Sequence, residues 1–421
     1  MPRFSTLPEW LAWQETLHPK KIDLELERVA GVAARLNLQD MQPVIVSVAG
    51  TNGKGSSVAM LESILRQAGY RVGSYTSPHL FRYNERILID GEAIDDASLC
   101  DAFAAVDAGR GDTTLSYFEF GTLAALWLFR QLSPDAVLLE VGLGGRLDAV
   151  NVMDADVALV TAVDIDHSHW LGNDRETIGR EKAGIFRAGR PAVCSDPEAP
   201  GSLLAVASGL GADWYGLGEQ FHTDLLADAW HWQGPDSRHD DLPLPSLPGH
   251  HQLNNAAGVL MVLDCLRDRL PVPPNAIRAG LAGASLPGRC EVIAGPVELV
   301  LDVSHNPHGA AALADMLAGR VCRGRTHLVL GMLEDKDADG TISALLPVTD
   351  HWYLASLDPA PGHTAKQLRT QVRQQSADAA TDCFPDVAGA IRQAFANAVP
   401  GDRVVVCGSF HTVADAMECR V

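Results

Sequence analysis

Apolar runs of strand length recur along the chain, with helical stretches between them. A first group covers residues 44–48, 72–75, 136–141 and 157–163, and a second group covers residues 299–303, 327–330 and 404–407. Continuous apolar strands separated by helices are typical of parallel sheets that are covered on both faces. The pattern therefore predicts an α/β protein with two such sheets.

The length of the chain and one short stretch indicate how it divides. With 421 residues the chain exceeds one ordinary hydrophobic core, and two domains fit the two groups of strands. Residues 282–289, Ala-Gly-Ala-Ser-Leu-Pro-Gly-Arg, follow a helical segment and precede a new strand, so we expect the linker there. Residues 195–250, rich in Gly, Pro, Asp and Trp, are interpreted as peripheral structure plus loops, with a hairpin around 230–232. The predicted parts are an N-terminal domain 1–284, a linker 285–289 and a C-terminal domain 290–421.

A glycine-rich turn, Ser-Val-Ala-Gly-Thr-Asn-Gly-Lys-Gly-Ser-Ser at residues 47–57, separates the first strand from a helix-like stretch at 58–68. Its glycines allow backbone N–H groups to approach phosphate oxygens, Lys54 adds a positive charge, and Ser56 or Ser57 can offer a hydroxyl to Mg²⁺. The strict P-loop pattern is not met, because Gly55 intervenes before the first serine, and a turn without ligand is the alternative. The predicted phosphate-binding residues are Gly50, Thr51, Asn52, Gly53, Lys54, Gly55 and Ser56.

This turn makes the fold prediction more specific. We expect a P-loop-containing N-terminal domain with a mainly parallel sheet, which binds a nucleoside triphosphate, and a smaller Rossmann-like α/β C-terminal domain.

Charge and composition limit the partners. The chain has 33 basic and 53 acidic residues, a formal net charge of −20, which opposes binding to nucleic acid or to anionic membrane surfaces. Its eight cysteines are scattered, the N-terminus lacks the features of a signal peptide, and no apolar run approaches the roughly 20 residues that span a bilayer. We expect a cytoplasmic monomer that acts on small molecules.

Polar residues follow several predicted strands, at the sheet edge where parallel sheets bind ligands. Glu140 ends an apolar run downstream of the phosphate turn and is the first candidate for holding Mg²⁺, with a solvent-facing glutamate as the alternative. The glycines that follow at 142, 144 and 145 fail the dinucleotide spacing. His167 is a second candidate for the metal site, with a structural histidine as the alternative. His167 and His169 do not indicate a zinc site, because no cysteine or third histidine lies nearby in sequence.

Two further sets of polar residues are read from position alone. Lys182, flanked by Arg180 and Glu181 on a short amphipathic helix, is by default solvated. In the second half, Asp302 and His305 follow one strand and Gly408 to His411 follow another, so they could face a cleft between the domains. Such a cleft favours group transfer, because closure excludes water.

Taken together, five motifs resemble the folylpolyglutamate synthase family of the Mur ligase superfamily: residues 50–56, 77–80, 140–149, 179–185 and 302–308. The likeness runs from about Leu17 to His411. It implies an ATP- and Mg²⁺-dependent ligase, with K⁺ as a further cation, in which a carboxylate becomes an acyl phosphate and the amine of L-glutamate displaces phosphate. The acids implied are dihydropteroate, giving dihydrofolate, and tetrahydrofolates, whose glutamate tail is extended.

The resemblance also implies roles for residues at matching positions. Ser77, Glu140 and His167 match metal-site positions, and Lys182 matches a lysine that the family carries as a carbamate able to help hold Mg²⁺, which reverses its default. Asn255, Arg289 and Asp302 match positions that contact ATP, and His305 matches a neighbouring position in the nucleotide cleft. The predicted catalytic residues are Lys54, Lys182 and His305. The segments expected to line a pterin pocket contain Ile22, Asp23, Tyr117, Phe118, Glu119, Leu147, Asp148 and Ala149.

Other functions are not excluded by these patterns. A folylpolyglutamate synthase that cannot use dihydropteroate is the nearest alternative, and a ligase for peptidoglycan precursors belongs to the same superfamily. A P-loop kinase or NTPase would explain Lys54 and Glu140, although it would need neither Lys182 nor the Asp302 cluster. A non-catalytic nucleotide-binding module is a third class, and the metal-site candidates argue against it.

Overall fold

The computed structural model describes residues 2–20, 22–357 and 361–419, and these residues form two compact units. Unit 1 comprises residues 1–246 and 253–284, and unit 2 comprises residues 247–252 and 285–421. The break at Ala284 and Ser285 falls at the start of the predicted linker 285–289, whereas residues 247–252 cluster with the second unit although they precede it in sequence.

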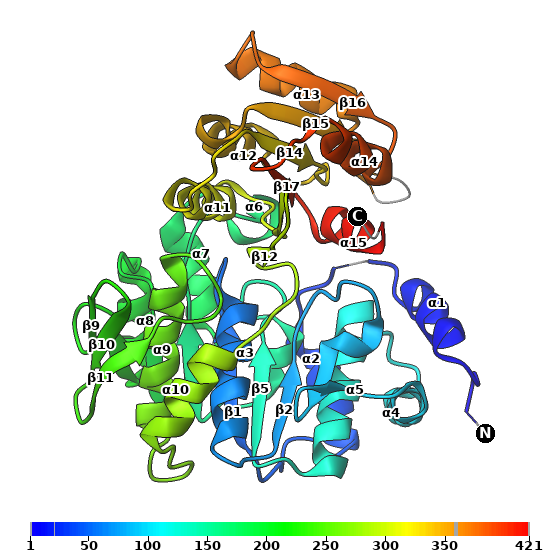
Figure 1. Cartoon of the computed structure of the whole chain (residues 1–421). Helices are drawn as coiled ribbons and strands as arrows, with labels where there is room; N and C mark the ends of the chain where they lie inside the picture. Colours follow the sequence, from blue (N-terminus) through cyan, green and yellow to red (C-terminus); the bar gives the residue numbers. More distant parts are fainter. Residues whose placement is uncertain (1, 21, 358–360, 420–421) are drawn as a thin grey trace. The chain divides into compact units, whose positions relative to one another are not determined.

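Unit 1 is built on an eight-stranded sheet in the order β4-β3-β2-β5-β1-β6-β7-β8 (Figure 1). All neighbours from β2 to β8 pair in parallel, and β3 and β4 form an antiparallel edge. The strands are β1 (Val44–Ala49), β2 (Val72–Tyr75), β3 (Ile87–Ile89), β4 (Glu92–Ala93), β5 (Ala136–Glu140), β6 (Val157–Val160), β7 (Pro191–Cys194) and β8 (Asp213–Gly216). Strands β1, β2, β5 and β6 are buried at every position, which is why their sequences are predominantly apolar.

The helices of unit 1 pack on this sheet and on one another. Helix α3 lies against α10, α4 lies against α5, and α7 lies against α8. The helices are α1 (Leu7–Leu17), α2 (Leu26–Arg35), α3 (Lys54–Gln67), α4 (Asp96–Arg110), α5 (Tyr117–Leu132), α6 (Ser168–Leu171), α7 (Arg175–Ala183), α8 (Gly201–Leu210), α9 (His251–Cys265) and α10 (Pro274–Gly283).

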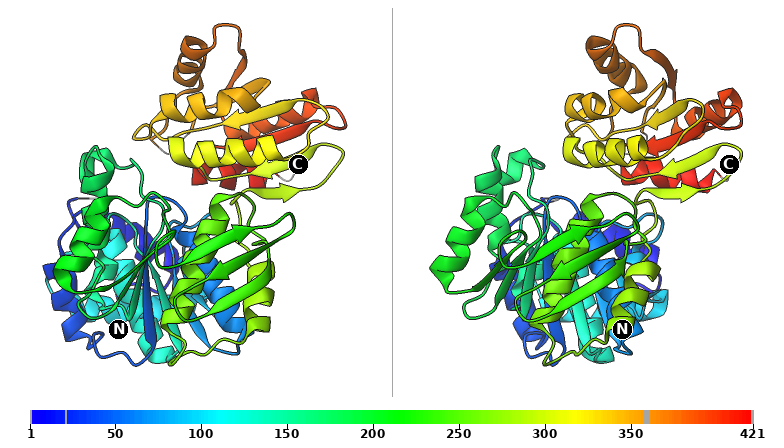
Figure 2. Two further views of the ribbon diagram at one scale, coloured as in Figure 1. Left: turned by 90° about the vertical axis from the view of Figure 1, so that its left-hand side faces the viewer. Right: turned by 60° about the vertical axis from the view of Figure 1, so that its left-hand side comes forward.

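Residues 195–250, interpreted as peripheral structure plus loops, contain the expected antiparallel hairpin around 230–232, but part of this stretch belongs to the main sheet and its covering helices and is not peripheral. Helix α8 and the edge strand β8 of the main sheet lie within this stretch, followed by a three-stranded antiparallel sheet of β9 (His222–Leu225), β10 (Ala229–Gln233) and β11 (Arg238–Pro243). Trp230 and Trp232 on the central strand are fully buried, and the indole N–H of Trp232 donates to the carbonyl of Ala257 on α9. Figure 2 shows this small sheet beside α9 and α10.

Unit 2 contains a six-stranded sheet in the order β12-β13-β17-β14-β15-β16, parallel except for β12. Helices α11 to α13 pack in sequence on one face, and α14 packs with α15 on the other (Figure 1). The strands are β12 (Glu291–Ile293), β13 (Glu298–Leu301), β14 (Thr326–Leu330), β15 (His351–Ala355), β16 (Ala380–Phe384) and β17 (Arg403–Cys407). The helices are α11 (Pro307–Gly319), α12 (Ala338–Leu345), α13 (Ala365–Gln375), α14 (Val387–Asn397) and α15 (Phe410–Glu418).

The predicted fold class, an α/β protein with a P-loop-type N-terminal unit and a smaller Rossmann-like unit, is confirmed. Among the helices of the described residues, none is long and apolar enough to cross a membrane.

Candidate functional site

The glycine-rich turn lies at the carboxyl end of β1 and leads directly into α3. Gly53 has a φ of +91° immediately before the first helical turn, a conformation that favours glycine. A Cβ atom on Gly53 would lie 2.4 Å from Oδ1 of the buried Asn255, so the missing side chain allows α9 to approach the turn. The structure therefore brings Asn255, predicted to contact ATP, against the predicted phosphate-binding turn within unit 1.

The turn is anchored to the segment that follows β6. The N–H of Thr51 donates to the carbonyl of Ala162 (2.7 Å), and the hydroxyl of Thr161 donates to the carbonyl of Asn52 (2.7 Å). A Cβ atom on Gly50 would lie 1.8 Å from that same hydroxyl oxygen. Strands β1 and β6 are neighbours whose connections leave in opposite directions, because the chain runs from β1 to β2 and from β6 to β7. Such a switch point is where open parallel sheets bind ligands.

Lys54 is the first residue of α3, four positions earlier than the predicted helix start. Its ammonium donates to the carbonyl oxygens of Gly50 (3.0 Å) and Thr51 (3.2 Å), which hold the charge beside the turn. Gly55 and Ser56 follow in the first helical turn and are buried. Because the first N–H groups of a helix have no intrahelical partner, the helix start and the ammonium together form an anion-binding site.

Glu140 ends β5, the strand next to β1, and is only 4% exposed. Its Oε2 accepts a hydrogen bond from the N–H of Ser77 (3.1 Å), which follows the neighbouring strand β2. A solvent-facing Glu140, the alternative drawn from its strand-end position, is therefore wrong. A buried carboxylate beside a phosphate-binding turn is the kind of ligand that divalent cations with oxygen preference take.

His167 lies further from its strand than the sequence indicated. Strand β6 ends at Val160, not at 163, so His167 belongs to a loop and precedes the short helix α6 with a φ of +51°. Its N–H donates to the carboxylate of Asp166 (2.7 Å), and its side chain is partly buried, whereas His169 is exposed. This conformation is uncommon for a residue other than glycine and is concentrated at functional sites.

Lys182 lies on α7 and is 2% exposed, so the solvated position that its charged neighbours in sequence indicated is wrong. Burial, followed by the positive charge of Lys54, lowers the pKa of the Lys182 ammonium to about 7, and Asp166 and Asp148 oppose this shift only in part. A Cβ atom on Gly145 would lie 2.9 Å from the carbonyl oxygen of Lys182. The glycine-rich segment after β5 therefore packs directly on the helix that carries this lysine.

The same segment folds around the carboxylate of Asp148. This side chain is 2% exposed and accepts hydrogen bonds from the N–H groups of Leu143 (2.8 Å) and Val150 (3.0 Å). Burial raises the pKa of the Asp148 carboxyl to about 6, although the backbone N–H groups lower it. Leu147 is partly exposed and Ala149 is buried. A buried carboxylate of this kind is poised to exchange a proton near neutral pH.

Tyr117 and Phe118, at the start of α5, belong to a cluster of aromatic rings. The ring of Phe118 lies 5.9 Å from that of Tyr75, and the ring of Tyr117 lies 5.4 Å from that of Tyr83. A Cβ atom on Gly142 would lie 2.6 Å from the Phe118 ring, so this glycine is explained by aromatic packing and not by a dinucleotide fingerprint. Both Tyr117 and Phe118 remain partly exposed, which leaves ring surface for a flat ligand.

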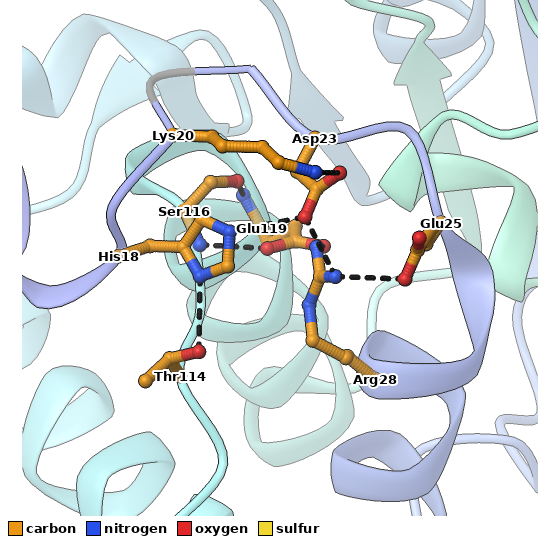
Figure 3. A network of polar contacts seen from close by, with 8 residues as sticks. All are labelled: His18, Lys20, Asp23, Glu25, Arg28, Thr114, Ser116 and Glu119. Carbon is orange, nitrogen blue, oxygen red and sulfur yellow. Dashed lines mark hydrogen bonds and ion pairs between the residues drawn. The ribbon is translucent and has the colours of Figure 1, made fainter.

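Two of the predicted pterin-segment carboxylates, Asp23 and Glu119, are held in one network (Figure 3). Asp23 Oδ2 contacts Nε2 of His18 (3.0 Å) and Nη1 of Arg28 (2.8 Å), and its Oδ1 contacts the ammonium of Lys20 (3.2 Å). Nη2 of Arg28 contacts Oε1 of Glu119 at 2.8 Å. Ile22, next to Asp23, is 38% exposed.

In unit 2, polar residues gather where β13 and β17 end. Asp302 is 6% exposed, and its carboxylate accepts hydrogen bonds from the N–H groups of Cys290 and Ser304, both at 2.8 Å. Asp302 thereby joins the end of β13 to Cys290, the residue that follows Arg289. Asp302 thus links the backbone of Cys290 to that of Ser304 at this edge of unit 2.

Phe410, at the start of α15, lies between two of the predicted residues. The guanidinium of Arg289 lies 5.1 Å from the centre of its ring, and the ring of His305 lies 6.2 Å from it. Nδ1 of His305 is 3.0 Å from the carbonyl oxygen of Val303. The structure therefore brings Arg289, His305 and Asp302 to one edge of unit 2.

Comparison with known proteins decides the family. Residues 288–410 match the model of the Mur ligase glutamate ligase domain. The chain is 46% identical to the dihydrofolate synthase/folylpolyglutamate synthase of Escherichia coli strain K12, over 414 residues that make up 98% of this chain and 95% of that protein. The chain belongs to the folylpolyglutamate synthase family. The resemblance inferred from the five motifs is confirmed.

Solved structures of family members agree over the whole chain. The structure of E. coli FolC in complex with DHPP and ADP has a TM-score of 0.94 and 46% identity, and covers 98% of this chain and 97% of its own. A bifunctional folylpolyglutamate synthase/dihydrofolate synthase from Yersinia pestis, complexed with AMPPNP and Mn ion, has a TM-score of 0.92 and 47% identity, with coverages of 100% and 99%. Proteins that share this fold thus bind adenine nucleotides and a divalent metal.

The predicted metal site contains few of the side chains that usually bind metal ions. Within residues 2–20, 22–357 and 361–419, no group of three or more His, Cys, Asp or Glu side chains is placed to hold a metal ion. The predicted set contains only two such side chains, Glu140 and His167, beside Ser77 and Lys182. The buried carboxylate of Glu140 fits a hard cation, and a carbamate on Lys182 would add a second anionic oxygen donor.

Two residues that organise the site were missed in the sequence. Thr161 anchors the phosphate turn, and Arg28 joins two segments that are 91 residues apart. Thr161 could have been found by its place in an otherwise apolar strand run. Arg28 carries no local signal, because its partner Glu119 is distant in sequence.

Proposed function

We propose that this chain is an ATP-dependent ligase that adds L-glutamate to dihydropteroate, giving dihydrofolate, and to the γ-carboxylate of tetrahydrofolates, extending their glutamate tail. The observation that carries the proposal is the close arrangement at one sheet edge of a phosphate-binding turn, a buried carboxylate and a buried lysine, in a chain that belongs to this family.

The chemistry proceeds through an acyl phosphate. A carboxylate is a poor electrophile, so an oxygen of the acid attacks the γ-phosphorus of ATP, and the bond to the β-phosphate oxygen breaks to release ADP. The amine of L-glutamate then attacks the acyl carbon, loses a proton, and displaces phosphate as the amide forms. Lys54 and the N–H groups at the start of α3 neutralise charge on the transferred phosphoryl group, and a bound divalent cation supplies further neutralisation.

Glu140, Ser77, His167 and Lys182 are proposed to hold the cation, which we take to be Mg²⁺, with K⁺ as a second cation. Lys182 would do so as a carbamate, formed when its neutral amine adds to carbon dioxide and loses a proton. The pKa of about 7 supports this role, because it leaves the buried amine uncharged in a large fraction of molecules at neutral pH. His305, Arg289, Asp302 and Asn255 remain proposed nucleotide contacts, and the protein is proposed to be a monomer.

The test is phosphate release from ATP with Mg²⁺, in which each component is omitted in turn. Release that requires both dihydropteroate and L-glutamate is expected, and release with tetrahydrofolate and L-glutamate is expected as well. Activity with tetrahydrofolate alone would reduce the proposal to a folylpolyglutamate synthase. Release without any acid or amino acid would point to an NTPase and would refute the ligase.

A further inference from the structure

The network in Figure 3 uses two of the three carboxylates that the sequence assigns to the pterin pocket, Asp23 and Glu119. Glu119 is the third residue of α5 and forms a capping box, in which its Oε2 accepts from the N–H of Ser116 (2.6 Å) while its Oε1 contacts Arg28. Its side chain is 3% exposed. Both oxygens of Glu119 are therefore committed to partners within the protein, as are both oxygens of Asp23.

Arg28 is the group that connects these two carboxylates. It lies in the first turn of α2, and its side chain is 19% exposed. One terminal nitrogen contacts Asp23 (2.8 Å) and Glu25 (3.0 Å), and the other contacts Glu119 (2.8 Å). Although burial alone would lower the pKa of the guanidinium, Glu119 and the other two carboxylates raise it, so Arg28 stays charged.

A planar guanidinium suits this task better than a lysine would, because its terminal nitrogens can contact separate carboxylates at the same time. A cation in the first turn of a helix is disfavoured by the helix dipole, so its place there is explained by the carboxylates that surround it. The pair with Glu119 is shielded from solvent, unlike the exposed partner Glu25, whose side chain is 59% exposed. The contact between residues 28 and 119 is thus the strong part of the network.

We propose that Arg28 is a positioning residue for the acid substrate, which fixes the segment carrying Ile22 and Asp23 relative to the start of α5 carrying Tyr117 and Phe118. In this role Asp23 and Glu119 act through Arg28. This inference rests on the proposed function, since it assumes that these segments bind the pterin part of the acid.

The test compares Arg28→Leu and Arg28→Lys with a matched control, Arg35→Leu. Arg35 lies on the same helix and also makes long-range contacts, but it donates to the carbonyl oxygens of Gly109 and Arg110 at the end of α4 and to the hydroxyl of Thr113, not to the start of α5. KM for dihydropteroate, ATP and L-glutamate, kcat, the Tm and the calorimetric affinity for dihydropteroate are measured for each variant. The unmodified chain is measured first, so that its inability to use dihydropteroate would count against the proposed function and not against Arg28.

Arg28→Leu is expected to raise KM and the calorimetric Kd for dihydropteroate about tenfold or more, which is about 1.4 kcal/mol, with KM for ATP within about twofold. Arg28→Lys should recover part of this loss, because an ammonium keeps the positive charge but cannot contact all three carboxylates at once. Arg35→Leu should lower the Tm without a selective change in KM. If Arg28→Leu does not fold, Glu119→Gln is measured instead, because glutamine keeps the capping box and loses the charge that Arg28 pairs with.

The inference would be overturned if Arg28→Leu, or Glu119→Gln in its place, changed KM for dihydropteroate no more than Arg35→Leu did. It would also be overturned if KM for all three substrates rose in parallel, since that pattern indicates general damage to the fold.

Discussion

Replacing Lys182 with methionine tests the electrostatics of the site, because methionine keeps much of the length and removes the charge. The pKa of the Lys182 ammonium is about 7 in the folded chain against 10.5 in the unfolded chain. Between these values the unfolded state binds a proton that the folded state lacks, so the stability of the unmodified protein rises with pH across this window. Below pH 7 both states are protonated and the cost of burying the charge is constant.

The size of the effect follows from the shift. A difference of 10.5 − 7 = 3.5 units, at about 1.4 kcal/mol per unit, gives an upper bound of about 5 kcal/mol for the burial cost below pH 7. The same shift leaves about half of the amines neutral at pH 7, against roughly one in 3,000 for an ordinary lysine. Lys182→Met should therefore be more stable than the unmodified chain at pH 6, and this advantage should shrink as the pH approaches 10.

The assay is thermal unfolding from pH 6 to 10 in buffers freed of carbon dioxide, with Lys366→Met at an exposed lysine as the control. Added bicarbonate should raise the Tm and the phosphate release of the unmodified chain and should change neither for Lys182→Met, which is expected to be inactive. A Tm difference between the unmodified chain and Lys182→Met that stays constant from pH 6 to 10 would refute the lowered pKa. A bicarbonate effect that is the same in both proteins would refute the carbamate.

Three further substitutions test other parts of the structure. Lys54→Ala should lower kcat by about 10²-fold or more, because phosphate charge loses its counter-charge, and turnover within tenfold of the unmodified rate would remove this residue from the mechanism. Gly53→Ala should raise KM for ATP at least tenfold, since the added Cβ would lie 2.4 Å from the side-chain amide oxygen of Asn255. Gly69→Ala is the control: Gly69 has a φ of +92° and no atom within 4 Å of an added Cβ, so this variant has the backbone strain alone and should leave KM unchanged. His327→Leu removes a buried imidazole that lies 3.0 Å from a tyrosine hydroxyl and 3.2 Å from a carboxylate, and should cost about 1–3 kcal/mol in thermal unfolding. His351→Leu removes the more exposed contact of His351 with Asp382 and should lower the free energy of unfolding by less than about 1 kcal/mol. Equal losses for His327→Leu and His351→Leu would contradict the larger stabilising role given to the buried His327.

The strands that carry the site could be predicted from the sequence because burial on both faces leaves a continuous apolar run. Strands β1, β2 and β5 begin where they were expected, and the phosphate turn follows β1. Strand β16, Ala-Thr-Asp-Cys-Phe, was not predicted, because it lies at the sheet edge and none of its residues is buried. Strand β15 was missed although it is largely buried, since its tryptophan and tyrosine are preceded by a histidine and no single aliphatic run marks it.

The chemical state of a residue was harder to predict than its position. Lys182 has charged neighbours in sequence and was placed in solvent by default, yet it is buried, and the glycine-rich segment after β5 packs against its backbone on α7. Gly145 allows that approach, but no pattern in residues 140–149 predicts which helix packs against this glycine. The pKa of the Lys182 amine depends on this long-range contact and on Lys54, which is 128 positions away.

Carboxylates illustrate the same distinction. Asp23 and Glu119 were expected among the residues of the segments that line a pterin pocket. In the folded chain the oxygens of Asp23 and Glu119 contact cations and a backbone N–H group of the protein. A count of the carboxylates near the pocket therefore overstates how many oxygens a ligand could use. Asp148, by contrast, accepts hydrogen bonds from the backbone N–H groups of Leu143 and Val150 and has a pKa raised to about 6 by burial, so it retains the capacity to take or give a proton. The sequence indicates which segments line the ligand site. Whether a carboxylate in such a segment binds the ligand, or instead holds the segment in place, depends on its partners in the folded protein.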